Sequence, residues 1–192
     1  MLCGIDEAGR GPIAGDLVVA GCILKSDIEG LADSKQLSEK KREELFELII
    51  QNATYHIVRH SPQLIDELGL STCMRNSLEE IIKHLQAKRY LFDGNTSFGV
   101  VGLETMIKAD TKVAEVSAAS ILAKVTRDRS MKEAAKLYPQ YGFEKHKGYI
   151  TKYHVEKIKE FGYCEIHRKS YKVKALEEFN QQRLEQPLPF FA

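Results

Sequence analysis

The chain has 192 residues, of which 43% are hydrophobic and 29% are charged, as is typical of a globular protein with a substantial core. The formal net charge is only +1, so charge alone does not indicate a polyanionic partner. No apolar run is long enough to span a bilayer and the start of the chain does not resemble a signal peptide. We therefore expect a cytoplasmic protein with no membrane partner.

Charge is unevenly distributed along the chain. Residues 124–174 contain 14 Lys and Arg against 6 Asp and Glu, a net charge of +8, so the remainder is net negative. A basic segment combined with clustered acids is typical of an enzyme that binds nucleic acid and cuts it with a metal. The alternative is that these lysines and arginines only form the solvated surface of helices.

The beginning of the chain alternates between strand and helix patterns. A strand is predicted at 2–6, and the almost continuous apolar run at 17–24 predicts a second, central strand. Glycines between them indicate a tight connection within one sheet. Ser38 is a suitable first residue for a helix at 38–52, and the alternation at 54–60 predicts a third strand.

The remainder of the chain has mainly helix patterns. In chain order we predict helices at 61–69 and 71–86, a short strand at 89–94, an extended segment at 102–110, a helix at 113–138, a loop at 139–151, helices at 152–162 and 171–185, and a tail at 186–192. No repeat or low-complexity linker divides the chain. We therefore predict an α/β fold with a mixed sheet, and a single domain over 1–192 in which 172–192 forms a C-terminal helix and tail.

Acidic residues stand at the ends of two predicted strands. Asp6 ends the first strand, Asp93 lies at the end of a later one, and Asp110 follows the extended segment. Neighbouring strands would bring these carboxylates together, and such a group favours the hard cations Mg²⁺ and Mn²⁺. Glu7 would point to the opposite face of a regular strand unless it reaches the site from the strand's end. The spacing alone is a weak signal, because acids at strand ends also cap turns.

Several longer motifs resemble those of the bacterial ribonuclease HII family, a type 2 ribonuclease H family. They are IDEAGRGPIAG, DSKQLS, the DG after a short strand, KAD followed by SAASILAKVTRD, and HKGY with IHRKSY. The resemblance implies a ribonuclease H-like fold, in which helices flank a mixed central five-stranded sheet and a C-terminal helical extension follows. It implies hydrolysis of the RNA strand of RNA/DNA hybrids. It also implies incision 5′ of single ribonucleotides embedded in duplex DNA, leaving 5′-phosphate and 3′-hydroxyl ends.

The resemblance further implies a catalytic group of four acids that holds two divalent ions, Mg²⁺ or Mn²⁺. These acids match Asp6 and Glu7 in DEAGRG, Asp93 in FDG and Asp110 in KAD. Asp128, in KVTRD, is a rival for the fourth position. It lies within a predicted helix, however, where it can pair with a neighbouring base, so we favour Asp110.

A ribose-reading segment is also implied by the resemblance. The backbone of Gly9, Arg10 and Gly11 would sense the 2′-hydroxyl, because glycine lets the chain approach the sugar closely. Tyr149, in HKGY, would stack on that sugar, and Arg10 would contact the phosphate backbone. The residues alone leave other roles open, namely a salt bridge from Arg10 to an acid and a loop-anchoring role for Tyr149.

Contacts to phosphate are implied for two further segments. Ser34 and Lys35, in DSKQLS, would lie near a phosphate beside the cut, although composition alone favours an exposed loop lysine. The basic residues of HKGY and IHRKSY are expected either to contact phosphate or to form hydrogen bonds within the scaffold.

Two other functions remain open at this stage. A non-catalytic protein that binds RNA/DNA hybrids could keep the fold, but the presence of all four motif acids argues against it. A metal-dependent DNA nuclease or phosphotransferase would explain the acids, but it would not need the Gly-Arg-Gly segment together with Tyr149.

The tail at 186–192, QPLPFFA, suggests a protein partner. It loosely resembles the short motifs by which bacterial repair proteins bind the sliding clamp, and exposed aromatic residues are typical of docking peptides. The alternative is that both phenylalanines pack on the protein's own surface. The family resemblance implies a monomer.

Overall fold

The computed structural model describes residues 1–31 and 37–185. Its strands are β1 (Leu2–Ala8), β2 (Leu17–Leu24), β3 (Ala53–His60), β4 (Arg89–Asp93) and β5 (Leu103–Met106). They form one five-stranded sheet in the order β3-β2-β1-β4-β5. Because β1 pairs antiparallel with β2 and parallel with β4, the sheet is mixed, and the predicted fold class is confirmed.

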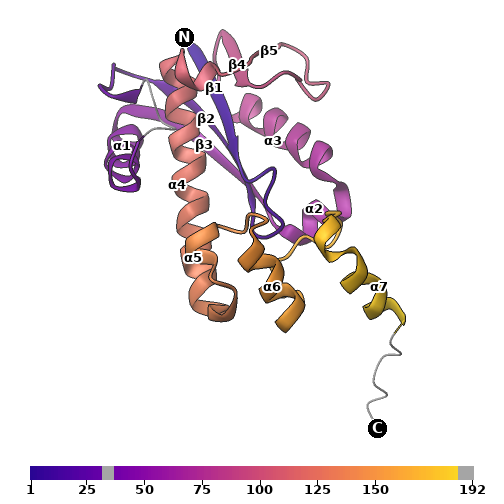
Figure 1. Ribbon diagram of the computed structural model, residues 1–192. Coiled ribbons are helices and arrows are strands. Elements are labelled where there is room, and N and C mark those ends of the chain that lie inside the picture. Colours follow the sequence, from indigo (N-terminus) through magenta and orange to yellow (C-terminus); the bar gives the residue numbers. More distant parts are fainter. Residues whose placement is uncertain (32–36, 186–192) are drawn as a thin grey trace.

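Helices flank both faces of this sheet (Figure 1). They are α1 (Glu39–Asn52), α2 (Pro62–Leu68), α3 (Leu70–His84), α4 (Ala114–Leu137), α5 (Phe143–His146), α6 (Lys152–Phe161) and α7 (Glu177–Glu185). The long α4 runs along β1 and β2 with α1 beside it, and α3 covers the opposite face. Within the described ranges, no helix is both long and apolar enough to cross a membrane.

The central strand β2 is buried on both faces, as its continuous apolar pattern predicts. Leu17 and Val19 pack toward α3, whereas Val18 and Ala20 pack toward α1 and α4. On the second face α4 can approach β1 closely, because a Cβ at Gly4 would lie 2.2 Å from the backbone of α4. The close contact holds α4 against the strand that carries the first acids.

The segment 139–151, predicted as a loop, contains two short helical turns. A 3-10 turn spans Pro139–Tyr141, and α5 follows it. Tyr141 and Phe143 are buried in a core cluster that also contains Ile158 of α6. The prediction was wrong here because segments of three or four residues are too short to show a helical period.

The C-terminal helix predicted at 171–185 is shorter than expected. It begins at Glu177, after a 3-10 turn at Lys174–Leu176. Tyr171 and Val173 pack instead into the core cluster between α6 and the end of α4. Their tertiary contacts override the helical pattern of the sequence.

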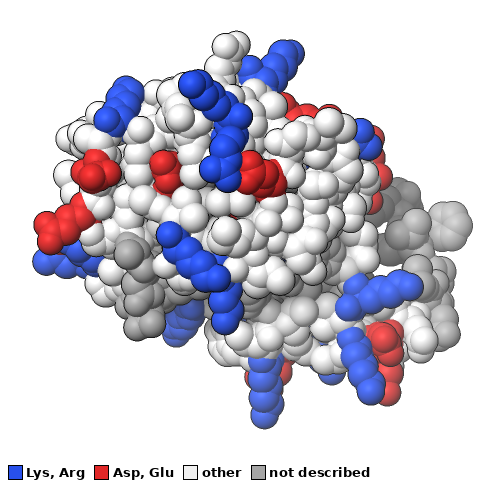
Figure 2. Space-filling model, turned by 90° about the horizontal axis from the view of Figure 1, so that it is seen from above, with Lys and Arg blue, Asp and Glu red and all other residues white. Residues whose placement is uncertain are grey.

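Charged side chains are dispersed on the face seen from above, where neither sign forms one continuous patch (Figure 2). Basic side chains of residues 124–174, the segment with a net charge of +8, also pair with acidic side chains of α1. Arg129 Nη2 lies 2.5 Å from Glu43 Oε2, and Lys132 Nζ lies 2.5 Å from Glu39 Oε1. Part of the basic segment therefore fastens α4 to α1.

Candidate metal and nucleic-acid site

Three carboxylates converge where β1 and β4 end. Asp6 lies near the end of β1, Asp93 is the last residue of β4, and Asp110 lies in the 3-10 helix Ala109–Thr111 after β5. One carboxylate oxygen from each residue lies within 4.8 Å of those from the other two. Since β1 and β4 are parallel neighbours, their carboxyl ends meet at the same edge of the sheet.

Local backbone contacts hold these acids in place. The backbone N–H of Glu7 donates to Asp6 Oδ1 at 2.7 Å, and that of Ala109 donates to Asp93 Oδ1 at 3.1 Å. Lys108 turns the chain between β5 and the 3-10 helix by adopting a left-handed φ of 58°. Asp6 and Asp110 are both buried.

Burial and repulsion from neighbouring carboxylates disfavour the charged forms of Asp6 and Glu7. Burial raises the pKa of Asp6 well above its ordinary value, and the charge of Glu7 raises it further. Burial likewise raises the pKa of Glu7, although Arg10 opposes the change. Bound cations would relieve this repulsion, and a donor set made only of carboxylate oxygens fits hard divalent cations.

Glu7 lies beside the three carboxylates without belonging to the group within 4.8 Å. Its Oε1 accepts a hydrogen bond from Arg10 Nη1 at 3.2 Å, which is the salt bridge that the sequence left open for Arg10. Its Oε2 is buried and has no hydrogen-bond partner in the described part of the chain. Glu7 therefore has one carboxylate oxygen that no described residue satisfies, and the residue lines a pocket together with Asp6.

A pocket of about 380 Å³ opens over three of the acids, Asp6, Glu7 and Asp93. The residues selected from the sequence that line it are Asp6, Glu7, Gly9, Arg10, Gly11, Asp93 and Tyr149. Three of the four acids, the Gly-Arg-Gly segment and the tyrosine thus surround one cavity although they are far apart in the sequence. Asp110 does not line this cavity, although one of its carboxylate oxygens lies within 4.8 Å of those of Asp6 and Asp93. Tyr149 is 48% exposed, so it is not packed as a buried loop anchor.

Three polar residues of the pocket were missed from the sequence: Arg42, Ser120 and Lys124. Ser120 and Lys124 lie one turn apart on α4, so they share one face of the helix. This spacing was the only feature of the sequence that could have indicated that both residues line the pocket. Lys124 Nζ also pairs with Asp128 Oδ1 at 2.7 Å. The rival acid Asp128 is thus neutralised by a helix neighbour, as expected, but it is buried and not at the helix surface.

The Gly-Arg-Gly segment is held by buried polar side chains. Gly9 has a left-handed φ of 98°, and a Cβ there would lie 2.4 Å from Nε of the buried Arg127. The Tyr171 hydroxyl donates to the carbonyl of Arg10 at 2.7 Å and accepts from Arg168 Nη1 at 2.9 Å. Arg168 is buried, so within IHRKSY it forms scaffold hydrogen bonds and does not present a phosphate-binding surface.

A chain of histidines supports the backbone of Tyr149. The N–H of Cys164 donates to His167 Nδ1 at 2.9 Å, so the proton of neutral His167 lies on Nε2. This Nε2 lies 3.0 Å from His154 Nε2, and His154 Nδ1 donates to the carbonyl of Tyr149 at 2.9 Å. The partners of His154 lie in other segments of the chain, so no local sequence pattern indicates them.

Burial keeps these two histidines neutral. Burial lowers the pKa of His154 from 6.5 to about 4 and that of His167 from 6.5 to about 3. The charge of His154 lowers the pKa of His167 further. Both rings therefore stay neutral at pH 7 and retain the donor and acceptor roles that the chain requires.

Ser34, Lys35 and the tail at 186–192 lie outside the described residues. The phosphate contacts of the first two and the docking of the tail stay predictions.

Comparisons with known proteins identify the family of this chain. Residues 3–174 match the family model described as Ribonuclease HII. The chain is 59% identical to Ribonuclease HII of Sulfurovum sp. (strain NBC37-1), over 92% of this chain and 94% of that relative. It is 61% identical to Ribonuclease HII of Aliarcobacter butzleri (strain RM4018), over 92% and 93%.

Solved structures show the same relationship. A chain of the PCNA:RNase HII complex from Archaeoglobus fulgidus superimposes with a TM-score of 0.77 at 31% identity, over 91% of this chain and 96% of that one. The ribonuclease H2 of Pyrococcus horikoshii gives 0.76 at 27% identity, over 96% and 99%. The chain therefore belongs to the ribonuclease HII family, and it is an enzyme with ribonuclease H activity on RNA/DNA hybrids.

Proposed function

We propose that the pocket lined by Asp6, Glu7 and Asp93, together with the neighbouring Asp110, is the active site of an endonuclease that incises duplex DNA on the 5′ side of a single embedded ribonucleotide. The same site would hydrolyse the RNA strand of longer hybrids. The observation that carries the proposal is the meeting of three carboxylates within 4.8 Å of one another, two of which, Asp6 and Asp93, line one cavity with the Gly-Arg-Gly segment.

The four motif acids are proposed as the metal ligands and as the catalytic residues. Asp6, Glu7, Asp93 and Asp110 offer only oxygen donors, which suits two Mg²⁺ or Mn²⁺ ions. When bound, such ions lower the pKa of a coordinated water and neutralise charge on the leaving 3′ oxygen. The buried, uncompensated Oε2 of Glu7 supports its inclusion, because burial of a polar atom without a partner is costly.

Recognition of the ribonucleotide is assigned to other residues that line the same pocket. The backbone of Gly9, Arg10 and Gly11 would hydrogen-bond the 2′-hydroxyl, and the half-exposed ring of Tyr149 would stack on the sugar. Arg10 has a side chain that is 40% exposed, so it can reach a phosphate while it contacts Glu7. Ser34 and Lys35 are proposed to bind the phosphate beside the cut, on the motif resemblance alone.

The test is cleavage of an end-labelled DNA duplex that contains one ribonucleotide, with Mg²⁺ and then with Mn²⁺. We expect a single cut on the 5′ side of the ribonucleotide, with 5′-phosphate and 3′-hydroxyl products, and no cut in the all-DNA duplex. Equal cutting of all-DNA duplex would favour a general DNA nuclease. Binding without cleavage under either metal would favour a non-catalytic hybrid-binding protein.

We further propose that the tail QPLPFFA docks a sliding clamp. The support is its loose resemblance to clamp-binding motifs, together with the Archaeoglobus fulgidus relative that was solved in complex with PCNA. Deletion of 186–192 should abolish binding to the bacterial clamp and leave cleavage of a free duplex unchanged. Equal clamp binding by the full and truncated chains, or none by the full chain, would contradict this proposal.

A further inference from the structure

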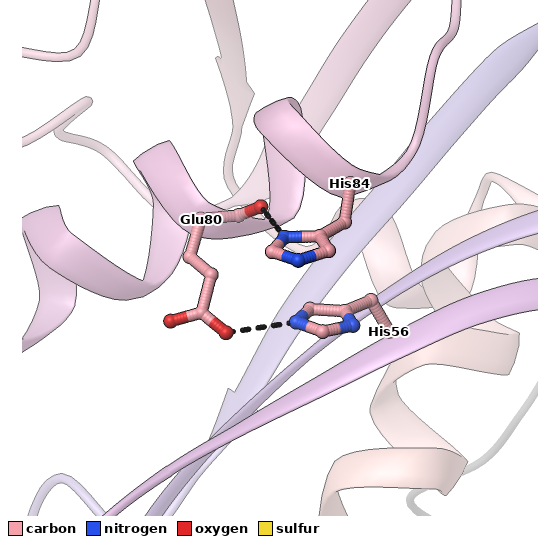
Figure 3. A group of neighbouring side chains, drawn as sticks. All are labelled: His56, Glu80 and His84. Carbon is pink, nitrogen blue, oxygen red and sulfur yellow. Dashed lines mark hydrogen bonds and ion pairs between the residues drawn. The ribbon is translucent and has the colours of Figure 1, made fainter.

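A second group of possible metal ligands lies between β3 and α3. It comprises His56 of β3 with Glu80 and His84 of α3, and one ligand atom from each lies within 4.8 Å of the others. Figure 3 shows the carboxylate of Glu80 and both imidazole rings on the same side of α3. We propose that this cluster binds a transition-metal ion, with Zn²⁺ as the best fit, and that the ion fastens β3 to α3.

Hydrogen bonds already orient the histidine of the helix. His84 Nδ1 lies 2.8 Å from the backbone oxygen of Glu80 (Figure 3). Because a carbonyl oxygen only accepts, Nδ1 carries the proton and the Nε2 lone pair of His84 is left for a metal. A ring N–H bonded to a backbone carbonyl is the arrangement that proteins commonly use to orient metal-binding histidines.

The second histidine faces the carboxylate directly. His56 Nε2 lies 2.8 Å from Glu80 Oε1, and the rings of His56 and His84 stack with centroids 4.2 Å apart and an interplanar angle of 5°. Because a carboxylate oxygen only accepts, His56 Nε2 carries the proton in the metal-free protein. Metal binding would displace this proton and leave it on Nδ1, so that two imidazole nitrogens and one carboxylate oxygen become available together. Because the two rings are parallel, their in-plane lone pairs do not point at one common position, so one ring must rotate before both can bind the same ion. His56 is partly exposed and Glu80 and His84 are exposed, which leaves room for this rotation.

The donor set selects the class of metal. Two imidazole nitrogens with one carboxylate form a common zinc ligand set that leaves a fourth position for water. Mg²⁺ prefers oxygen ligands, so it would compete poorly here. The side chains of His56 and Glu80 are 27% and 45% exposed, and an ion can therefore enter from solvent.

This cluster is separate from the active site. His56 pairs with Gly21 of β2, which pairs in turn with Ile5, and Ile5 packs on the face covered by α3. Asp6 follows Ile5 in β1 and therefore projects from the opposite face, where α4 lies. Since β3 is at one edge of the sheet, an ion at this cluster would fasten that edge strand to the helix above it.

The test compares Zn²⁺ binding by the metal-free wild type and its variants, using equilibrium dialysis in excess Mg²⁺. We expect His84→Ala and His56→Ala to bind one Zn²⁺ fewer per chain than the wild type. Glu80→Gln should weaken that ion at least tenfold. The matched control is Glu79→Gln, which makes the same change at a neighbouring residue that pairs with Arg75, and it should bind as the wild type does.

Two further readouts separate metal binding from misfolding. Zn²⁺ should raise the melting temperature of the wild type more than that of His84→Ala, and both should cleave a hybrid equally well with Mg²⁺. Equal Zn²⁺ stoichiometry in the wild type and both histidine variants would overturn the proposal. An equal loss in Glu79→Gln and Glu80→Gln would also overturn it, because it would indicate nonspecific binding to the helix.

Discussion

Asp110 and Asp128 are both buried carboxylates, but their neighbours differ. Asp110 lies with Asp6 and Asp93, whereas Asp128 pairs with Lys124 at 2.7 Å. Asp110→Asn should therefore reduce kcat by about a thousandfold, or ~4 kcal/mol of transition-state stabilisation, in cleavage of a single-ribonucleotide duplex. Asp128→Asn removes an ion pair outside the acidic cluster and should change kcat less than about tenfold. The reverse order of effects would assign the fourth acid to Asp128.

Tyr171 connects the C-terminal segment to the ribose-reading backbone through its hydroxyl. Tyr171→Phe removes the bond of 2.7 Å to the Arg10 carbonyl and should cost about 1 kcal/mol of unfolding free energy. It should also lower kcat/KM on a single-ribonucleotide duplex several-fold, because the Gly-Arg-Gly segment loses an anchor. Urea unfolding and steady-state kinetics measure both effects.

The matched control is Tyr163→Phe, which deletes a hydroxyl bond of 3.0 Å to Asn180, a partner outside the pocket. It should cost similar stability and leave kcat/KM unchanged. Equal kinetic losses in the two variants would show that Tyr171 acts only through general stability.

The sequence predicted the residues whose chemistry is local and distinctive. Asp6 and Asp93 were found because they end apolar strands, and Tyr149 was found through its motif. Arg42 and the hydrogen bond from Tyr171 to Arg10 could not be predicted, because they depend on contacts between distant segments. The hydroxyl of Tyr171 is the only difference from phenylalanine, and hydrophobic periodicity does not distinguish these two residue types.

The connection between β1 and β2 depends on backbone conformation as much as on contacts. Gly9→Ala places a Cβ 2.4 Å from Arg127 Nε at a left-handed φ of 98°. We expect a loss of about 2–4 kcal/mol in unfolding free energy, measured in urea, and little remaining cleavage activity.

Gly30→Ala is the control for backbone strain alone. Gly30 has a similar φ of 87°, but a Cβ there would meet nothing within 4 Å. It should cost about 1 kcal/mol and leave cleavage unchanged. Equal stability losses in the two variants would mean that the contact with Arg127 contributes nothing.

Elements with strong periodic patterns were predictable, and short ones were not. The strand β2 and the helix α4 lie where their apolar runs indicated, since burial of those runs determines the element. The four-residue helix α5 and the late start of α7 follow from burial of Tyr141, Phe143 and Tyr171 in a shared core cluster. Such tertiary burial has no local pattern.

The stability of the whole molecule should fall in mild acid because of its buried histidines. Burial lowers the pKa of His154 from 6.5 to about 4. Between these two pH values, this histidine is therefore protonated in the unfolded chain and neutral in the folded chain. This contribution is fully present above pH 6.5 and is lost progressively as the pH falls toward about 4, by up to ~1.4 kcal/mol per pH unit. Urea midpoints at about pH 7 and about pH 5 measure the loss.

His154→Gln isolates this histidine from the acids. Asp6 has a raised pKa and contributes with the opposite sign, since its stabilising effect is lost as the pH rises. Asp6 is present in both proteins, so its contribution cancels when the stability of the variant is subtracted from that of the wild type at each pH. The wild type should lose more stability on acidification than His154→Gln, and equal losses would exclude His154 as the cause.

The central claim is that the carboxylates around Asp6 perform metal-dependent cleavage, and the most direct measurement compares Asp6→Asn with Asp16→Asn on a duplex that contains one ribonucleotide. Asp16 pairs with Arg59 at 2.6 Å and lies outside the acidic cluster, so it is a matched control for the same chemical change. With folding and duplex binding intact, Asp6→Asn should cut at least about a thousandfold more slowly, and Asp16→Asn should cut within about threefold of the wild type. Cleavage by Asp6→Asn at the wild-type rate, or equal losses in both variants, would contradict the account.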